Sequence, residues 1–144
     1  MVKSRMKFFT AGDVGGITYL ITNNLVNYLI VISTLSGMFG WPDEIVYGRV
    51  IPGMSIGLMV GGLLYALMAY RLNKKEGRVD ATALPSGIST PAMFVILYGV
   101  VMPLNYALGD PELAWSAAVA ACFIGGMVEF MGGFIGPWLK SKLP

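Results

Sequence analysis

The stretch VDATALPSGISTPAMFVILYGVVMP, residues 79–103, decides how this chain is expected to fold. From Pro91 onward it is apolar and helical in character, but it meets a second proline at Pro103. A helix between these two prolines has about 12 residues and a length of roughly 18 Å at 1.5 Å per residue. Because the hydrocarbon core of a membrane is about 30 Å thick, such a helix crosses only part of it.

The residues before this helix predict how the rest of the membrane is crossed. Residues 79–90 contain turn residues at 85–87 and show no helical periodicity. Thr90 is expected to be the N-cap of the helix, with Pro91 at its first position. The sequence therefore predicts an extended piece that reaches the middle of the membrane and a half-helix that completes the crossing. The alternative is a cytoplasmic loop followed by a proline-kinked helix.

Three other segments are apolar and long enough to cross a membrane alone, since a span needs about 20 apolar residues. The chain is 56% hydrophobic and only 12% charged, whereas soluble domains carry about 25% charged residues. We therefore expect an all-α integral membrane protein, a single domain of residues 1–144 with four membrane-crossing segments, the third of them discontinuous. The four expected segments are residues 17–39, 51–70, 81–108 and 113–139.

The basic residues alternate between the two sides of these segments and predict the topology. Nine of the ten lie at the N-terminus, between the second and third segments, or at the C-terminus, and only Arg49 lies on the opposite side. The positive-inside rule then places both termini in the cytoplasm of a multi-pass protein of the cell membrane. The nine are Lys3, Arg5, Lys7, Arg71, Lys74, Lys75, Arg78, Lys140 and Lys142.

The composition argues against an enzyme. The chain has no His and one Cys, so a soft-metal site would lack ligands. It also has no Ser-His-Asp or Cys-His set, no P-loop and no GxGxxG motif. We expect neither catalytic residues nor a cofactor or metal, and no nucleic acid as a partner. The expected partners are membrane lipid and a small-molecule solute.

Three asparagines, Asn23, Asn24 and Asn27, lie well inside the first apolar segment. Asn23 and Asn27 are four residues apart and share a helix face, and Asn24 lies close by. An amide in hydrocarbon needs a hydrogen-bond partner. The cluster therefore predicts the lining of a polar, solute-binding cavity. The alternative is hydrogen bonding between helices that only holds them together.

The discontinuous third segment supplies the other candidates for solute binding. Irregular backbone at membrane depth is tolerated where it is buried in protein or lines a water-filled cavity. The start of a half-helix offers unpaired N–H groups and a positive dipole end. Broken helices of this kind build transporter sites near the midplane. The candidate residues, acting through backbone amides or hydroxyls, are Ser86, Gly87, Ile88, Ser89 and Thr90.

Glu129 is the only ionisable residue inside the predicted segments away from their ends. Carboxylates inside membranes often belong to proton relays, so Glu129 is a candidate for proton coupling. It lies about 16 residues past Leu113, roughly 24 Å along the helix, which is toward the cytoplasmic side. The alternative is a carboxylate that reaches interfacial water.

Two sets of glycines predict close packing between helices. In the second segment Gly53, Gly57 and Gly61 recur at intervals of four, a spacing that lets another helix approach closely. The last segment contains a similar set. Its members are Gly125, Gly132, Gly133 and Gly136.

Several motifs follow one another in an order that is known from one family of transporters. They are GMSIG at 53–57, TALPSGISTP at 82–91 and the apolar run 115–139. Together they resemble the second to fourth spans of the xanthine/uracil permease family, also called the nucleobase–ascorbate or nucleobase–cation symporter-2 family. DVGG at 13–16 and NLVN at 24–27 look like the first span of its uncharacterised permease branch. The resemblance is one of pattern and order and extends over nearly the whole chain.

The resemblance implies a fold and a function. In that family two inverted repeats of seven spans form the transporter, and the third span of each repeat has a short strand before a half-helix, with the substrate between them. This chain would supply the first four spans of one repeat. The remaining spans, with a carboxylate used for substrate and proton recognition, would come from another chain or a missing C-terminal part. We expect part of a secondary active transporter for a nucleobase-like or small anionic solute, with half of a midplane binding site.

Two other readings remain open. A small four-span exporter would resemble the small multidrug resistance family, but that family has its essential Glu in the first span, where this chain has amides, and it shows little charge bias. A non-transporting membrane scaffold subunit would use its Gly-rich faces for packing and would pair its asparagines internally. An enzyme is the least expected.

Overall fold

The computed structural model describes residues 11–77, 79, 81 and 87–142. The regular structure of these residues is entirely helical and includes four helices that are long and apolar enough to cross a membrane. This finding confirms the expected all-helical fold with four candidate crossings. The chain divides into two units, one ending at Thr90 and the other beginning at Pro91. The four helices are Val14–Met38, Asp43–Glu76, Thr90–Leu108 and Pro111–Gly136.

The first unit begins with α1 (Ala11–Ile32), which continues into the π-helical segment η1 (Ser33–Met38). Val31 and Leu35 are buried near the end of this helix, whereas Leu25 and Leu29 are exposed. A membrane helix can expose large apolar side chains to lipid, so this pattern fits a helix that packs along one side only.

The second helix is longer than the expected segment 51–70, because residues 43–50, which lie before that segment, are also helical. It consists of α2 (Asp43–Ile45), the π-helical segment η2 (Val46–Val50) and α3 (Ile51–Glu76). Pro42 occupies the N-cap position and the first turn is acidic, as the helix dipole favours. The polar appearance of this stretch therefore marked a helix N-terminus rather than a loop.

The other end of α3 also extends past its predicted limit at Tyr70. The helix runs on to Glu76 and ends at Gly77, which has a positive φ of 65° and donates its N–H to the Asn73 carbonyl. Most residues in this last part are good helix formers, and they continue a helix beyond the apolar segment at little cost. Glycine adopts the left-handed conformation of such an end without steric strain.

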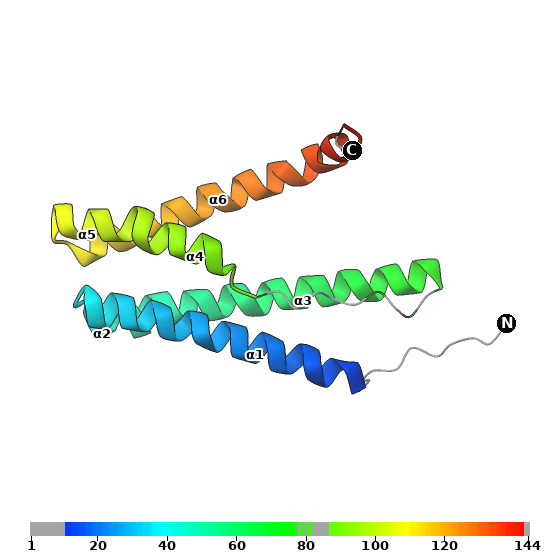
Figure 1. The fold of residues 1–144 in the computed structure, drawn as a ribbon, viewed down its shortest axis with the longest axis horizontal. Helices are drawn as coiled ribbons and strands as arrows, with labels where there is room; N and C mark the ends of the chain where they lie inside the picture. Colours follow the sequence, from blue (N-terminus) through cyan, green and yellow to red (C-terminus); the bar gives the residue numbers. More distant parts are fainter. Residues whose placement is uncertain (1–10, 78, 80, 82–86, 143–144) are drawn as a thin grey trace. The chain divides into compact units, whose positions relative to one another are not determined.

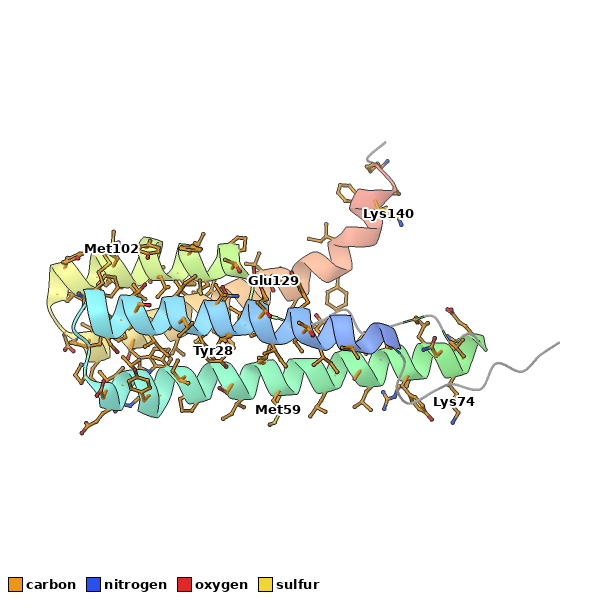
Figure 2. The ribbon with its side chains drawn as sticks, turned by 60° about the horizontal axis from the view of Figure 1, so that its bottom comes forward. Tyr28, Met59, Lys74, Met102, Glu129 and Lys140 are labelled. Carbon is orange, nitrogen blue, oxygen red and sulfur yellow. The ribbon has the colours of Figure 1, made fainter. Side chains whose placement is uncertain are left out.

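Helices α1 and α3 lie side by side within the first unit (Figure 1). Tyr28 points from α1 toward α3 (Figure 2), and its hydroxyl lies 2.8 Å from the Ser55 hydroxyl. The Ser55 hydroxyl in turn donates to the Ile51 carbonyl at 2.8 Å. This polar contact fixes the two helices relative to each other at one point along their length.

The third helix is continuous through Pro103, so the predicted end at this proline is wrong. The helix consists of α4 (Thr90–Ile96), the π-helical segment η3 (Leu97–Val101) and α5 (Met102–Leu108). The N–H of Met102 bonds to the Leu97 carbonyl, five residues back. A π-helical turn changes the hydrogen-bond register directly before the residue that lacks an N–H, and the chain stays helical there.

The two π-helical segments η2 and η3 share a sequence pattern. YGRVIP at residues 47–52 and YGVVMP at 98–103 each place a proline at the second residue of the following α-helix. In both segments two apolar residues four apart are buried, Val46 with Val50 and Leu97 with Val101. The repeated pattern indicates that these prolines accompany a π-helical turn and do not end a helix.

A tight turn joins α5 to α6 (Pro111–Lys140) in the second unit. Gly109 has a positive φ of 63° and donates its N–H to the Asn105 carbonyl at 3.0 Å. The Asp110 carboxylate then accepts the N–H of Glu112 at 2.9 Å, so it caps the start of α6. Helix α6 packs against α5 and η3.

Candidate functional site

The described segment Gly87–Ser89 is not helical, and two asparagines of α1 hold its backbone. The Ile88 N–H donates to Asn24 Oδ1 at 3.0 Å, and Asn27 Nδ2 donates to the Ile88 carbonyl at 3.3 Å. Asn24 and Asn27 are three residues apart, so both side chains reach the same side of α1. The two amides therefore satisfy both polar backbone groups of Ile88.

Asn27 makes a further hydrogen bond that uses its remaining polar atom. The Thr90 hydroxyl donates to Asn27 Oδ1 at 3.0 Å. Asn27 is only 1% exposed, and a buried amide is costly unless it is hydrogen-bonded. Because both ends of its amide have a partner, Asn27 acts as an anchor for the start of the third helix.

Gly87 permits a close approach between the non-helical segment and α1. A Cβ atom at this position would lie 3.0 Å from Asn23 Nδ2 and 3.3 Å from Asn24 Oδ1. Both distances are shorter than most Cβ contacts, so the Asn23 and Asn24 amides would have to shift by a few tenths of an ångström to admit a side chain at Gly87. The structure thus brings all three predicted asparagines together with Gly87, Ile88 and Thr90, while Ser86 lies outside the described residues.

Several polar groups around Gly87 have no partner among the residues that the structure describes. They belong to the half-buried Asn23 amide, the Asn24 NH₂ group and the exposed Ser89 hydroxyl. Asn24 itself is 6% exposed, so its NH₂ group lies at a largely enclosed position. These groups offer both hydrogen-bond donors and acceptors to a ligand.

The position of Ile88 along α1 gives the depth of the segment relative to the first candidate span. Asn24 lies ten residues after Val14 and fourteen before Met38, the ends of that span. At 1.5 Å per residue these separations are about 15 Å and 21 Å. The hydrogen bonds to Asn24 and Asn27 therefore place the backbone of Ile88 beside the middle of the first span.

Asn73 holds the chain that leads toward this segment, and the sequence analysis missed it. Its Nδ2 donates to the Ala81 carbonyl at 2.7 Å, and its Oδ1 accepts the Ala81 N–H at 3.0 Å. Asn73 is only 8% exposed. A single asparagine among basic residues shows no distinguishing sequence pattern. The only available signal was Gly77, four residues later, which indicates the end of α3 and so places Asn73 in its last turn.

Glu129, the candidate for proton coupling, lies on α6 in the second unit and is exposed. Its carboxylate has no hydrogen bond or ion pair with another described residue. No group of three or more His, Cys, Asp or Glu side chains in the described part of the chain is placed to hold a metal ion. Cys122, in the same helix, is exposed.

No family model, curated protein or solved structure matches this chain. A functional interpretation is therefore built on the residues themselves, and above all on the hydrogen bonds between α1 and Ile88.

Proposed function

We propose that the chain is part of a secondary active transporter and contributes half of a binding site near the membrane midplane. The solute is nucleobase-like or a small anion, and further transporter spans supply the other half. The observation that carries the proposal is the non-helical backbone of Ile88, held between Asn24 and Asn27. The resemblance to the xanthine/uracil permease family supports the same function. In this proposal both termini of the chain lie in the cytoplasm.

A discontinuous third crossing is part of this proposal, but its support differs from the length argument of the sequence. Thr90–Leu108 has 19 residues, so the helix is long enough to cross alone. The support comes instead from Ile88, which lies beside the middle of the first candidate span, Val14–Met38, and precedes that helix. Irregular backbone at this depth needs hydrogen-bond partners, and the two asparagines supply them.

The groups left around Gly87 suit a flat, polar solute. An amide presents a donor and an acceptor side by side, as does the edge of a nucleobase, so the Asn23 amide is matched to such an edge. The Asn24 NH₂ group adds a donor, because its Oδ1 already accepts the Ile88 N–H. Gly87 has no side chain, so the Asn23 and Asn24 amides lie close to its backbone. A small anion would use only the donors, namely the amide NH₂ groups and the Ser89 hydroxyl.

The competing function is a non-transporting scaffold, and one observation favours it: both ends of the Asn27 amide are satisfied within the chain. In a scaffold, the side chains of Asn23 and Ser89 would also be inaccessible to water. In a transporter they would face water and solute. Accessibility at these two positions therefore separates the two functions, whereas the burial of Asn27 is common to both.

Thiol accessibility tests the proposal directly. Asn23→Cys and Ser89→Cys, each in a Cys122→Ala background, should react with a membrane-impermeant thiol reagent in the full chain in vesicles. The lipid-facing controls Leu25→Cys and Leu29→Cys, which replace exposed apolar residues of α1, should not react. Uracil or xanthine should slow the reaction at Asn23→Cys when the further transporter spans of the proposal are present. Protection at all four positions would support the scaffold.

A further inference from the structure

Helix α6 has two chemically different faces. One is bulky and apolar and exposes Phe123, Met127, Phe130, Phe134 and Trp138. The opposite face carries small residues and a single carboxylate, and these lie on one side because 3.6 residues complete a turn. We call it the small-residue face. Its members are Ala114, Ala118, Gly125, Glu129, Gly132 and Gly136.

The first half of the small-residue face is already a packing surface. Ala114 is 0% exposed and Ala118 is 5% exposed, and α6 packs against α5 and η3 after the turn that joins them. Small residues allow close approach between membrane helices. Because its first half packs against a helix, the whole small-residue face is suited to contact another helix.

The second half of the same face is bare within its unit. A Cβ atom added to Gly125, Gly132 or Gly136 would meet nothing within 4 Å. Figure 1 shows this part of α6 extending past the start of α4. Since the large apolar side chains lie on the opposite face, the bulky face is the one suited to lipid. The uncovered half continues an existing helix contact and has no helix to complete it.

Glu129 lies in the middle of this uncovered half. It is exposed, and its carboxylate has no hydrogen bond or ion pair with another described residue. A carboxylate inside a membrane pairs with a cation or a hydrogen-bond donor. A second copy of α6 packed in the same orientation through this face would instead bring two Glu129 carboxylates together, and like charges repel. Charge thus favours a different helix over a second copy.

We propose that Gly125, Glu129, Gly132 and Gly136 dock a further transmembrane helix with small residues and a Lys or Arg opposite Glu129. The proposal rests on the proposed function, which requires additional transporter spans, and it identifies the face that one of them contacts. Glu129 lies seven residues before Gly136, where the candidate span ends. The partner's cation would therefore lie about 10 Å from that end of the span.

A synthetic transmembrane peptide tests the docking. The probe has a Leu/Ala body, a GxxxG face and one Lys about 10 Å from its cytoplasmic end, and the matched control has Leu in place of Lys. Energy transfer is measured between the labelled peptide and the full chain labelled through Ser141→Cys in a Cys122→Ala background, in phosphatidylcholine vesicles. The Lys peptide should associate about threefold to tenfold more tightly than the Leu peptide.

Variants of the chain locate the contact. Glu129→Gln should remove the advantage of the Lys peptide, and Gly132→Leu should weaken both peptides by obstructing the close approach. Met127→Leu, on the bulky face, should change neither. Equal association of the two peptides, or an advantage that persists in Glu129→Gln, would overturn the proposal.

The same vesicles also distinguish two other occupants of the small-residue face: a second copy of the chain and helices of the same chain. Cross-linking of Gly132→Cys between two chains would show a second copy on this face. Protection of Gly132→Cys in a monomeric chain without peptide would show that helices of the same chain cover it. Either result overturns the proposal. Thiol reactivity at Asn23→Cys, measured without peptide, tests the proposed function independently, so a failure of docking is not mistaken for a failure of solute binding.

Discussion

Asn27 binds the backbone of Ile88 from a position 61 residues earlier in the chain: its Nδ2 donates to the Ile88 carbonyl at 3.3 Å. With the Asn24 bond to the Ile88 N–H, this contact holds the start of the third helix against the middle of the first candidate span. A polar cluster that looked like a cavity lining in the sequence is therefore partly a structural anchor. In the proposed function, the amide of Asn23 and the hydroxyl of Ser89 remain for a solute.

Replacing Asn27 with leucine should destabilise the chain. Asn27→Leu keeps the volume but leaves the Ile88 carbonyl without the amide that binds it, and the Thr90 hydroxyl without its acceptor. An unsatisfied buried polar group costs about 1–3 kcal/mol. Because Ile88 and Thr90 are half-buried, the free energy of unfolding, measured by denaturation in mixed micelles, should fall by about 1–3 kcal/mol. Thr18→Ala removes an exposed hydroxyl bonded to the Val14 carbonyl and is the control, with a change within about 0.5 kcal/mol.

Alanine at Gly87 should disturb the site without disturbing the helices. Its Cβ would lie 3.0 Å from Asn23 Nδ2, so the Asn23 side chain has to move. Thiol reactivity at Ser89→Cys and its protection by uracil or xanthine should both decrease in Gly87→Ala. Gly62→Ala is the matched control, because a Cβ there meets nothing within 4 Å. Equal effects of the two substitutions would remove the special role of Gly87.

The Asn73 side chain should protect the backbone of Ala81 from solvent. In Asn73→Ala both hydrogen bonds to Ala81 are lost, whereas Asn73→Asp keeps an acceptor for the Ala81 N–H and loses the donor to its carbonyl. Hydrogen exchange at the Ala81 amide should therefore be fastest in Asn73→Ala and intermediate in Asn73→Asp. Lys74→Ala, next to it on the exposed surface, should exchange like the unchanged protein.

Reporter fusions should place the turn before α2 and the C-terminus on opposite sides of the membrane. A reporter inserted at Gly40, in the turn before α2, should report the outside, and one fused after Lys142 should report the cytoplasm. The physical reason is the concentration of nine of the ten basic residues on one side. An outside C-terminus would contradict four crossings and the depth assigned to Ile88.

The four helices could be predicted because length and apolarity are properties of each segment alone. Their ends were harder. Pro42 and its acidic neighbours were left outside the expected segments although they begin a helix, and Pro103 was interpreted as a stop although a π-helical turn accommodates it. A π-helical turn shifts one hydrogen bond and leaves the apolar pattern almost unchanged, so only the repeated YGxV motif could have indicated it.

The sequence indicated which residues gather around Ile88 but not the hydrogen bonds between them. The asparagines were singled out by their rarity in an apolar segment, and Gly87–Thr90 by their position at the start of the expected half-helix, and both signals are local. Asn27 forms hydrogen bonds with Ile88 and Thr90 through both ends of its amide. These bonds depend on how α1 packs against a segment some 60 residues away, and no local pattern carries that information. Asn73 went unnoticed for the same reason, since its partner Ala81 is an ordinary residue.

The membrane depth and the water accessibility of Ser89, measured together, test the proposed site most directly. A spin label at Ser89→Cys in a Cys122→Ala background can be compared for relaxation by oxygen, which partitions into lipid, and by a water-soluble nickel complex. Labels at Leu25 and Lys74 give the values for lipid at mid-depth and for the cytoplasmic surface. We predict that Ser89 has the depth of Leu25, placing it near the midplane, and yet is reached by the nickel complex. A label at the depth of Lys74, or one at mid-depth that only oxygen reaches, would contradict a solute-binding segment at the midplane.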